Sequence, residues 1–194
     1  GDYVEFGVFE GSSMISAYRA NLSSTKKNNF NMIANGPSRN YYGFDSFEDG
    51  FKIFDEKDNH PTWIEGNLKT NYEKTYRRIK KNIKKSKFKL IKGFVEETCK
   101  NKKPEDYGIN KISLALFDMD LGTPTLIGLE FIKNSLVEGS IIAFDEFFAY
   151  KGSMEKGEYH AFEVFKKNNP NLVFREFKVY GIASYSFMLT KIKK

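Results

Sequence analysis

The sequence predicts an α/β protein built on a doubly wound, mostly parallel sheet. Short strand-like runs alternate with helical stretches along the whole chain, in the order expected of consecutive βαβ units. Two of these runs, residues 112–117 and 140–144, are almost continuously apolar, which is typical of parallel strands covered on both faces. The last two strands, residues 172–179 and 183–190, flank Gly181 and favour an antiparallel hairpin at the sheet edge.

The first half of the chain supplies three predicted strands. Residues 3–9 alternate between apolar and small or charged side chains, and a tight turn leads into a helix over residues 14–21. The second strand, residues 41–44, is followed by a polar, aromatic-rich segment, residues 46–67, whose Gly50, Pro61 and Gly66 indicate a long functional loop. Helical spacing of apolar residues predicts a helix over residues 70–85, and residues 88–91 form the third strand.

The second half continues the same alternation. A short helical stretch over residues 95–102 precedes the strand at residues 112–117. Pro124 suits the first turn of a helix that runs to about Leu136, with Thr123 as its N-cap, and another helix covers residues 159–168. No repeat or linker divides the chain, so we expect one domain over residues 1–194. Because the sequence opens on a strand without an initiator methionine, we expect native residues to precede Gly1.

The charge of the chain is unevenly distributed. The formal net charge is +6, and the basic residues are concentrated in residues 69–92 and 100–103. Such a patch either binds phosphate or nucleic acid or is simply the solvated face of a helix, and the second explanation is the more common. The lone Cys99 cannot form an internal disulfide, and no apolar run is long enough to cross a bilayer. We therefore expect a cytoplasmic protein that does not enter a membrane.

Candidate functional residues cluster at the predicted carboxyl ends of the strands. In an open α/β sheet these ends share one edge, and ligands bind where the strand order reverses. Glycines after the first strand let the backbone approach a ligand, and an acid after the second is placed to accept hydrogen bonds from ribose hydroxyls. In strand order, the residues are Glu5, Gly7, Gly11, Ser12 and Ser13, then Asp45, then Gly93, then Asp118 and Asp120, and finally Asp145 and Glu146.

Asp118 and the pair Asp145-Glu146 are the most informative of these residues. They terminate apolar strands near the expected centre of the sheet, where carboxylates are costly to bury unless they are paired or bind a cation. Their hard oxygens suit Mg²⁺, which makes a coordinated hydroxyl more acidic. The alternative is that these acids merely cap the helices that follow, and Asp120 is the residue best suited to be only a cap.

Four segments of the chain together resemble the macrocin O-methyltransferase (TylF-like) family. They are residues 4–13 (VEFGVFEGSS), 42–48 (YGFDSFE), 117–121 (FDMDL) and 141–146 (IIAFDE), and the resemblance extends over nearly the whole chain. It implies a Rossmann-like fold with a seven-stranded sheet, S-adenosylmethionine as methyl donor, and Mg²⁺-assisted transfer to a hydroxyl. The implied acceptor is a small molecule that carries a carbohydrate, and a phosphate-binding role of the basic patch would favour a nucleotide-linked sugar.

The resemblance also implies roles for individual residues. The residues that match the site around the methionine part of the donor are Glu5, Gly7, Gly11, Ser12 and Ser13. Asp45, with the adjoining Ser46, matches the ribose-binding acid, and Gly93 and Phe94 match the adenine site. Asp118, Asp145 and Glu146 match the metal site, and Asp118 also matches the general base and is expected to contact the donor.

The chain departs from the family pattern at three places. It has Glu146 where the family usually has Asp, Gly122 where it has Tyr, and Asp49-Gly50-Phe51 where it has Gly-Leu-Pro. The longer side chain of Glu146 either ligates the metal, shifts its position or takes no part in binding it, so donor binding is the firmer part of the resemblance. The changed loop implies a different acceptor.

The resemblance and the loop suggest a mechanism. Asp118 and the metal would lower the pKa of the acceptor hydroxyl, and binding would align oxygen, carbon and sulfur for in-line displacement. The loop would close over the acceptor with its ring-bearing side chains. For His60, an ordinary loop position is favoured over a role as catalytic base, and His160 is expected to be structural. The loop side chains are Phe47, Phe51, Phe54, His60 and Trp63.

Two other functions remain as alternatives. A nicotinamide-dependent oxidoreductase uses the same kind of sheet, but the chain lacks the G-x-G-x-x-G fingerprint. A nucleic-acid-binding protein or nucleic acid methyltransferase would use the Lys-rich patch, but the Asn/Asp-Pro-Pro-aromatic motif of amino methyltransferases is absent from the sequence. The sequence leaves open whether the protein forms a homodimer.

Overall fold

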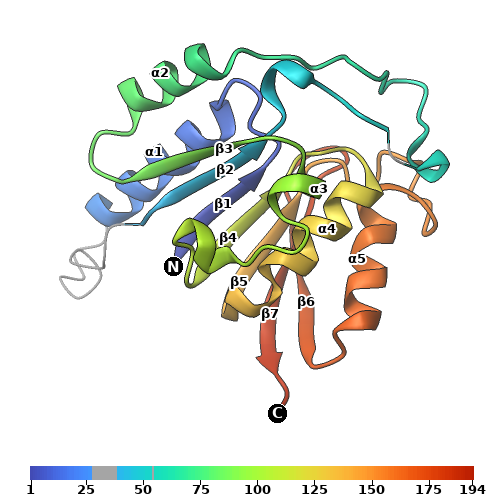
Figure 1. Cartoon of the computed structure of the whole chain (residues 1–194). Helices are drawn as coiled ribbons and strands as arrows, with labels where there is room; N and C mark the ends of the chain where they lie inside the picture. The colour runs from blue at the N-terminus through green and yellow to red at the C-terminus, as the bar shows by residue number, and fades with distance from the viewer. Residues whose placement is uncertain (28–38, 54) are drawn as a thin grey trace.

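The chain folds into one twisted sheet, seen in a computed structural model that describes residues 1–27, 39–53 and 55–194 (Figure 1). Within these residues, seven strands are arranged in the order β3-β2-β1-β4-β5-β7-β6. The first five are parallel, and β7 pairs antiparallel with both β5 and β6, which confirms the predicted sheet and its C-terminal hairpin. The strands are β1 (Asp2–Phe6), β2 (Tyr41–Asp45), β3 (Phe88–Lys92), β4 (Ile112–Phe117), β5 (Leu136–Phe144), β6 (Leu172–Val179) and β7 (Tyr185–Ile192).

Helices cover the sheet on two sides. Helices α1 (Ser12–Lys27) and α2 (Tyr72–Asn82) pack on β1, β2 and β3, and α3 (Val95–Thr98), α4 (Gly122–Ile132) and α5 (Gly157–Asn168) pack on the opposite face (Figure 1). Four short 3₁₀ turns complete the described part of the chain: η1 (Phe47–Asp49), η2 (Glu56–Asp58), η3 (Pro104–Tyr107) and η4 (Lys133–Ser135). None of the described helices is long and apolar enough to cross a membrane.

Phenylalanines at the carboxyl ends of four neighbouring strands hold these ends level. The ring of Phe6 lies 5.0 Å from that of Phe44 and 4.8 Å from that of Phe117, which lies 5.5 Å from that of Phe144. The strand register pairs the same residues, and all four rings are fully buried. Aromatic pairs at such distances add to the free energy of burial. The residues that follow these four phenylalanines are therefore delivered to one rim of the sheet.

Some predicted boundaries were wrong. Strand β1 stops at Phe6 rather than residue 9, because Gly7 adopts a φ of +87° and turns the chain. Helix α4 ends at Ile132, and β5 begins at Leu136 instead of residue 140, with Gly139 at a φ of +93° where the pairing with β4 shifts register. The hydroxyl of Ser140 accepts a hydrogen bond from the Val137 amide across this irregularity. A bulge of this kind breaks the periodicity from which a strand is predicted.

Candidate active site

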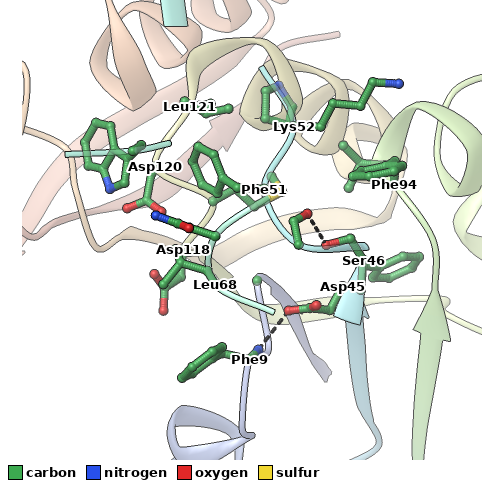
Figure 2. A pocket seen from close by; sticks show the side chains of 18 of the residues that line it. Phe9, Asp45, Ser46, Phe51, Lys52, Leu68, Phe94, Asp118, Asp120 and Leu121 are labelled. Atoms are coloured by element: carbon green, nitrogen blue, oxygen red, sulfur yellow. Dashed lines mark hydrogen bonds between the residues drawn. The ribbon is translucent and has the colours of Figure 1, made fainter. Parts of the chain in front are cut away.

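A pocket of about 450 Å³ lies at the carboxyl ends of the parallel strands, beside the point between β1 and β4 where strand order reverses (Figure 2). Residues from the ends of all five parallel strands line it, together with a long segment between β2 and α2. Seven of the residues predicted to bind the donor or the metal are in its lining: Gly7, Asp45, Ser46, Gly93, Phe94, Asp118 and Glu146.

The other predicted donor residues lie outside the lining and support the turn after β1. Glu5 is fully buried, and its carboxyl group accepts hydrogen bonds from the Tyr3 hydroxyl at 2.7 Å and from the Ser13 hydroxyl. Burial is the main reason that the pKa of Glu5 is raised to about 8. Gly11 and Ser12 adjoin α2, where the Arg78 guanidinium donates to the Ser12 hydroxyl at 3.0 Å.

Asp45 joins the turn after β1 to the segment after β2. Its Oδ2 accepts hydrogen bonds from the Val8 amide at 2.7 Å and from the Phe9 amide at 2.8 Å, the second of which is drawn in Figure 2. Its Oδ1 accepts one from the Phe47 amide at 2.5 Å. Burial raises the pKa of Asp45, and these amides act in the opposite direction. A carboxylate has about four acceptor sites, so three amides leave room for one further donor.

The β3 end of the pocket combines an aromatic face with an acid. The ammonium group of Lys52 lies 5.3 Å from the centre of the Phe94 ring (Figure 2). Both carboxyl oxygens of Glu96 are buried without a hydrogen-bond partner among the described residues, and burial raises the pKa of this group. Glu96 was not predicted from the sequence, where its only signal is its position just after Gly93 and Phe94.

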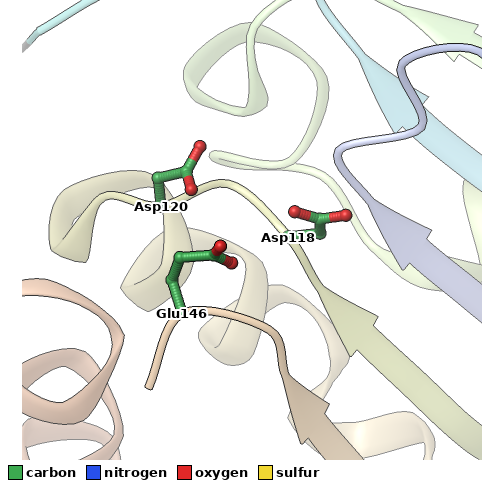
Figure 3. Close-up of side chains that lie close together, drawn as sticks. All are labelled: Asp118, Asp120 and Glu146. Carbon is green, nitrogen blue, oxygen red and sulfur yellow. The ribbon is translucent and has the colours of Figure 1, made fainter. Parts of the chain in front are cut away.

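Three carboxyl groups meet at the other end of the pocket. Each of Asp118, Asp120 and Glu146 offers an oxygen within 4.8 Å of the oxygens offered by the other two. Figure 3 shows Asp118 and Asp120 on the loop after β4, and Glu146 on the loop after β5. Burial and then repulsion by neighbouring acids raise the pKa of Asp118 and of Asp120 to about 7, and they raise the pKa of Glu146 as well.

The prediction that Asp120 is only a helix cap was wrong, as was the choice of Thr123 as N-cap. Helix α4 has Leu121 at its N-cap position, with no capping side chain of its own. Asp120 is instead buried at a φ of +63°, beside the other acids. Asp145 repels Asp118, its side chain contacts that of Glu146, and its Oδ1 accepts a hydrogen bond from the Ser184 hydroxyl at 3.0 Å. The three acids whose oxygens lie within 4.8 Å of one another are Asp118, Asp120 and Glu146, and Asp145 adjoins them.

The three carboxylates of the acidic cluster are the kind of oxygen ligands that a hard cation prefers. Glu146 Oε2 is buried and has no hydrogen-bond partner among the described residues. Behind it, the fully buried Glu158 accepts a hydrogen bond from the Glu146 amide at 3.0 Å, and its other oxygen is also without a partner there. Mutually repelling carboxyl groups in such a place are stabilised when a divalent cation binds between them.

Residues 46–53 and 55–68, which we call the covering segment, form one wall of the pocket. The amide of Phe51 donates to the Asn67 carbonyl and that of Gly66 to the Phe51 carbonyl, both at 2.8 Å, so the segment folds back on itself. Phe51, Trp63, Ile64 and Leu68 line the pocket, as expected of a loop that closes over a ligand.

Other residues of this segment differ from the prediction. Phe47 is fully buried and packs on Tyr72, with ring centres 5.1 Å apart, so its assignment to the acceptor wall was wrong. Phe54 lies outside the described residues. His60 stacks on Trp63 at 3.9 Å, outside the pocket lining, and its Nδ1 accepts from the Thr62 amide, as for an ordinary loop histidine. His160 contacts the Met154 carbonyl through Nδ1 at 3.0 Å, which fits a structural role.

Comparison with known proteins identifies the fold. No family sequence model and no curated protein sequence matches the chain. Among solved structures, CalS11, a calicheamicin methyltransferase, aligns with a TM-score of 0.67 at 23% identity, over 97% of this chain and 72% of that chain. The chain has a Rossmann-like methyltransferase fold.

Two further structures agree with this result. The O-methyltransferase NovP aligns with a TM-score of 0.70 at 14% identity, over 98% of this chain and 72% of that one. An O-methyltransferase from Bacillus cereus, in complex with S-adenosylhomocysteine (SAH), aligns with a TM-score of 0.59 at 10% identity, over 98% and 74%. CalS11 is also described as a TDP-rhamnose 3′-O-methyltransferase.

Proposed function

We propose that the protein is an S-adenosylmethionine-dependent O-methyltransferase whose acceptor is the hydroxyl of a sugar-bearing or nucleotide-linked small molecule. The observation that carries this proposal is the convergence of Asp118, Asp120 and Glu146 at one end of a pocket at the strand-order reversal. The methyltransferase fold supports the donor, and the TDP-rhamnose on which CalS11 acts supports a sugar nucleotide as acceptor. The TylF-like family remains our choice within this class.

The donor would occupy the part of the pocket between the turn after β1 and the end of β3. S-adenosylmethionine, when bound, supplies an electrophilic methyl group on a sulfonium. Asp45 has one acceptor site left for a ribose hydroxyl, and the unpartnered Glu96 carboxyl suits the amino group of adenine. Phe94 and Gly93 line the adenine region, and Gly7 and Ser46 adjoin the rest of the donor. Glu5, Gly11, Ser12 and Ser13 act by shaping the turn.

The acidic end of the pocket would bind Mg²⁺ and the acceptor. Asp118, Asp120 and Glu146 are the proposed ligands, and Asp145 supports them from the next position. Mg²⁺, when bound, lowers the pKa of a coordinated hydroxyl. Asp118 would accept the proton of that hydroxyl as the oxygen bonds to the methyl carbon and the carbon–sulfur bond breaks, which leaves SAH as product.

Calorimetric titration of the protein with SAH and with NAD⁺ tests the donor. We expect SAH to bind and NAD⁺ not to bind, and binding of NAD⁺ alone would overturn the proposal. A screen of sugar nucleotides and glycosides for methyl transfer then identifies the acceptor. A steeply salt-dependent affinity for RNA or DNA would favour a nucleic acid acceptor instead, although part of the basic helix serves the fold, since Arg78 donates to the Glu10 carbonyl and the Ser12 hydroxyl.

Stability should depend on pH and Mg²⁺ together. The pKa values of Asp118 and Asp120 are about 7 in the fold, well above those of unfolded chains, so the folded state binds more protons between roughly pH 4 and 7. Its stability should therefore fall as pH rises through this range. Mg²⁺ binds the ionised acids, so we expect it to raise Tm clearly at pH 8 and little at pH 5.5.

Thermal unfolding with and without Mg²⁺ at both pH values measures this effect. Asp120→Asn should raise Tm at pH 8 without metal and reduce the response to Mg²⁺, because asparagine tolerates a positive φ and carries no charge. Glu105→Gln, at an exposed position in η3, is the control and should behave as the wild type. An equal Mg²⁺ response in Asp120→Asn and wild type would refute the metal site.

A further inference from the structure

Asp58 is a buried acid within the covering segment, and the proposed chemistry gives it no role. It is 1% exposed, whereas the preceding residues of η2, Glu56 and Lys57, are exposed. A carboxylate is expensive to bury unless strong hydrogen bonds satisfy it. The partners of Asp58 therefore indicate what the segment is attached to.

The Asp58 carboxylate caps helix α4 from a distance of 64 residues in the sequence. Its Oδ1 accepts hydrogen bonds from the amides of Gly122 at 2.8 Å and Thr123 at 3.3 Å, and Oδ2 lies 3.4 Å from the Thr123 amide. First-turn amides have no acceptor within their own helix, and the helix dipole favours an anion there. Because α4 has no capping side chain of its own, Asp58 supplies both the acceptor for these amides and the negative charge at the helix N-terminus.

The geometry around Gly122 leaves room for this contact and little else. A Cβ atom at Gly122 would lie 2.9 Å from the Gly157 carbonyl oxygen and 3.3 Å from Asp58 Oδ1. On its other side, Asp58 is fixed through its carbonyl oxygen, which accepts a hydrogen bond from the Tyr150 hydroxyl at 2.9 Å. The segment is thus attached both to α4 and to the chain after β5.

The position of α4 matters because the residues just before it belong to the site. Asp118, Asp120 and Leu121 line the pocket and lead directly into Gly122. Phe51, Trp63 and Ile64, on either side of Asp58 in sequence, also line the pocket. One carboxylate therefore joins the wall that covers the pocket to the strand end that carries two of the acids.

We propose that Asp58 is a positioning residue: its bonds to the first turn of α4 hold the covering segment closed and fix the acidic loop beneath it. The part of this inference that concerns catalysis rests on the proposed function, but the attachment itself does not.

Amide hydrogen exchange of the free protein tests the attachment without any assay of activity. In Asp58→Ala, we expect exchange at Gly122, Thr123 and residues 55–68 to accelerate ~10- to 100-fold, the range expected for losing hydrogen bonds to a charged group. Asp58→Asn, which keeps one acceptor oxygen, should fall between. Tyr150→Phe removes only the second attachment and should loosen residues 55–68 while Gly122 stays protected.

Asp55→Asn is the matched control. Asp55 is exposed in the same segment, and among the described residues its carboxylate accepts only from the Lys57 amide at 2.9 Å, a bond that asparagine can keep. Its exchange should equal that of the wild type. Unchanged exchange at Gly122 and Thr123 in folded Asp58→Ala, or equal acceleration in Asp55→Asn, would overturn the inference.

A kinetic comparison then tests positioning. With an acceptor in hand, Asp58→Ala should raise the acceptor KM and lower kcat, with partial rescue in Asp58→Asn, while Asp55→Asn matches the wild type. Faster exchange with unchanged KM and kcat would support the attachment of the segment to α4 but refute the role of Asp58 in positioning. If no methyl transfer is found in any variant, the proposed function fails, and the exchange results still decide the attachment.

Discussion

Asp118→Asn is expected to reduce methyl transfer by ~10²- to 10⁴-fold, the usual contribution of a general base. Asparagine keeps the shape of the side chain but cannot accept the proton of the acceptor hydroxyl. Burial and neighbouring acids raise the pKa of Asp118 to about 7 in the metal-free protein, and a cation bound beside it would favour the ionised carboxylate that a base needs. The measurement is kcat with saturating donor and acceptor.

Donor binding separates loss of chemistry from loss of the site. Asp118→Asn should bind SAH about as tightly as the wild type, because Asp45, Phe94 and Glu96 are untouched. Glu97→Gln removes an exposed carboxylate near the β3 end, outside the pocket lining, and should retain full activity. Wild-type turnover by Asp118→Asn, or loss of SAH binding together with activity, would contradict the assigned role.

The sheet and one rim of the site could be predicted because they follow regular periodicity. Apolar runs located β4 and β5, and parallel strands place their carboxyl ends at one edge, which brought Asp118 and Glu146 together. The fully buried phenylalanines that level these strand ends also stand out as apolar positions in the sequence.

The loops could not be predicted in the same way, because side-chain direction has no fixed period there. The strand ends favoured Asp145 over Asp120 as the third acid, but Asp120, at a positive φ, lies in the cluster, whereas Asp145 adjoins Glu146 and binds Ser184. The capping of α4 by Asp58 depends on an irregular segment 64 residues earlier, so no local capping motif reveals it.

Gly7→Ala is expected to be the most destabilising single change at the rim, by more than about 4 kcal/mol, a loss that few substitutions cause. A Cβ atom at Gly7 would lie 1.8 Å from the carbonyl oxygen of Asp118, closer than non-bonded atoms can approach. Relief requires the ends of β1 and β4 to separate, although the Asp118 amide donates to the Phe6 carbonyl at 2.9 Å. The φ of +87° adds backbone strain.

Gly139→Ala distinguishes the clash from the strain. Gly139 has a similar φ of +93°, but a Cβ atom there would contact nothing within 4 Å. Gly139→Ala should lower the free energy of unfolding by only about 1–2 kcal/mol, the cost of the left-handed conformation. Urea unfolding of the two variants gives the comparison, and equal losses would show that β1 and β4 can part at little cost. Any folded Gly7→Ala protein should bind SAH poorly, because the same close approach that excludes a methyl group sets the turn between Asp45 and Asp118.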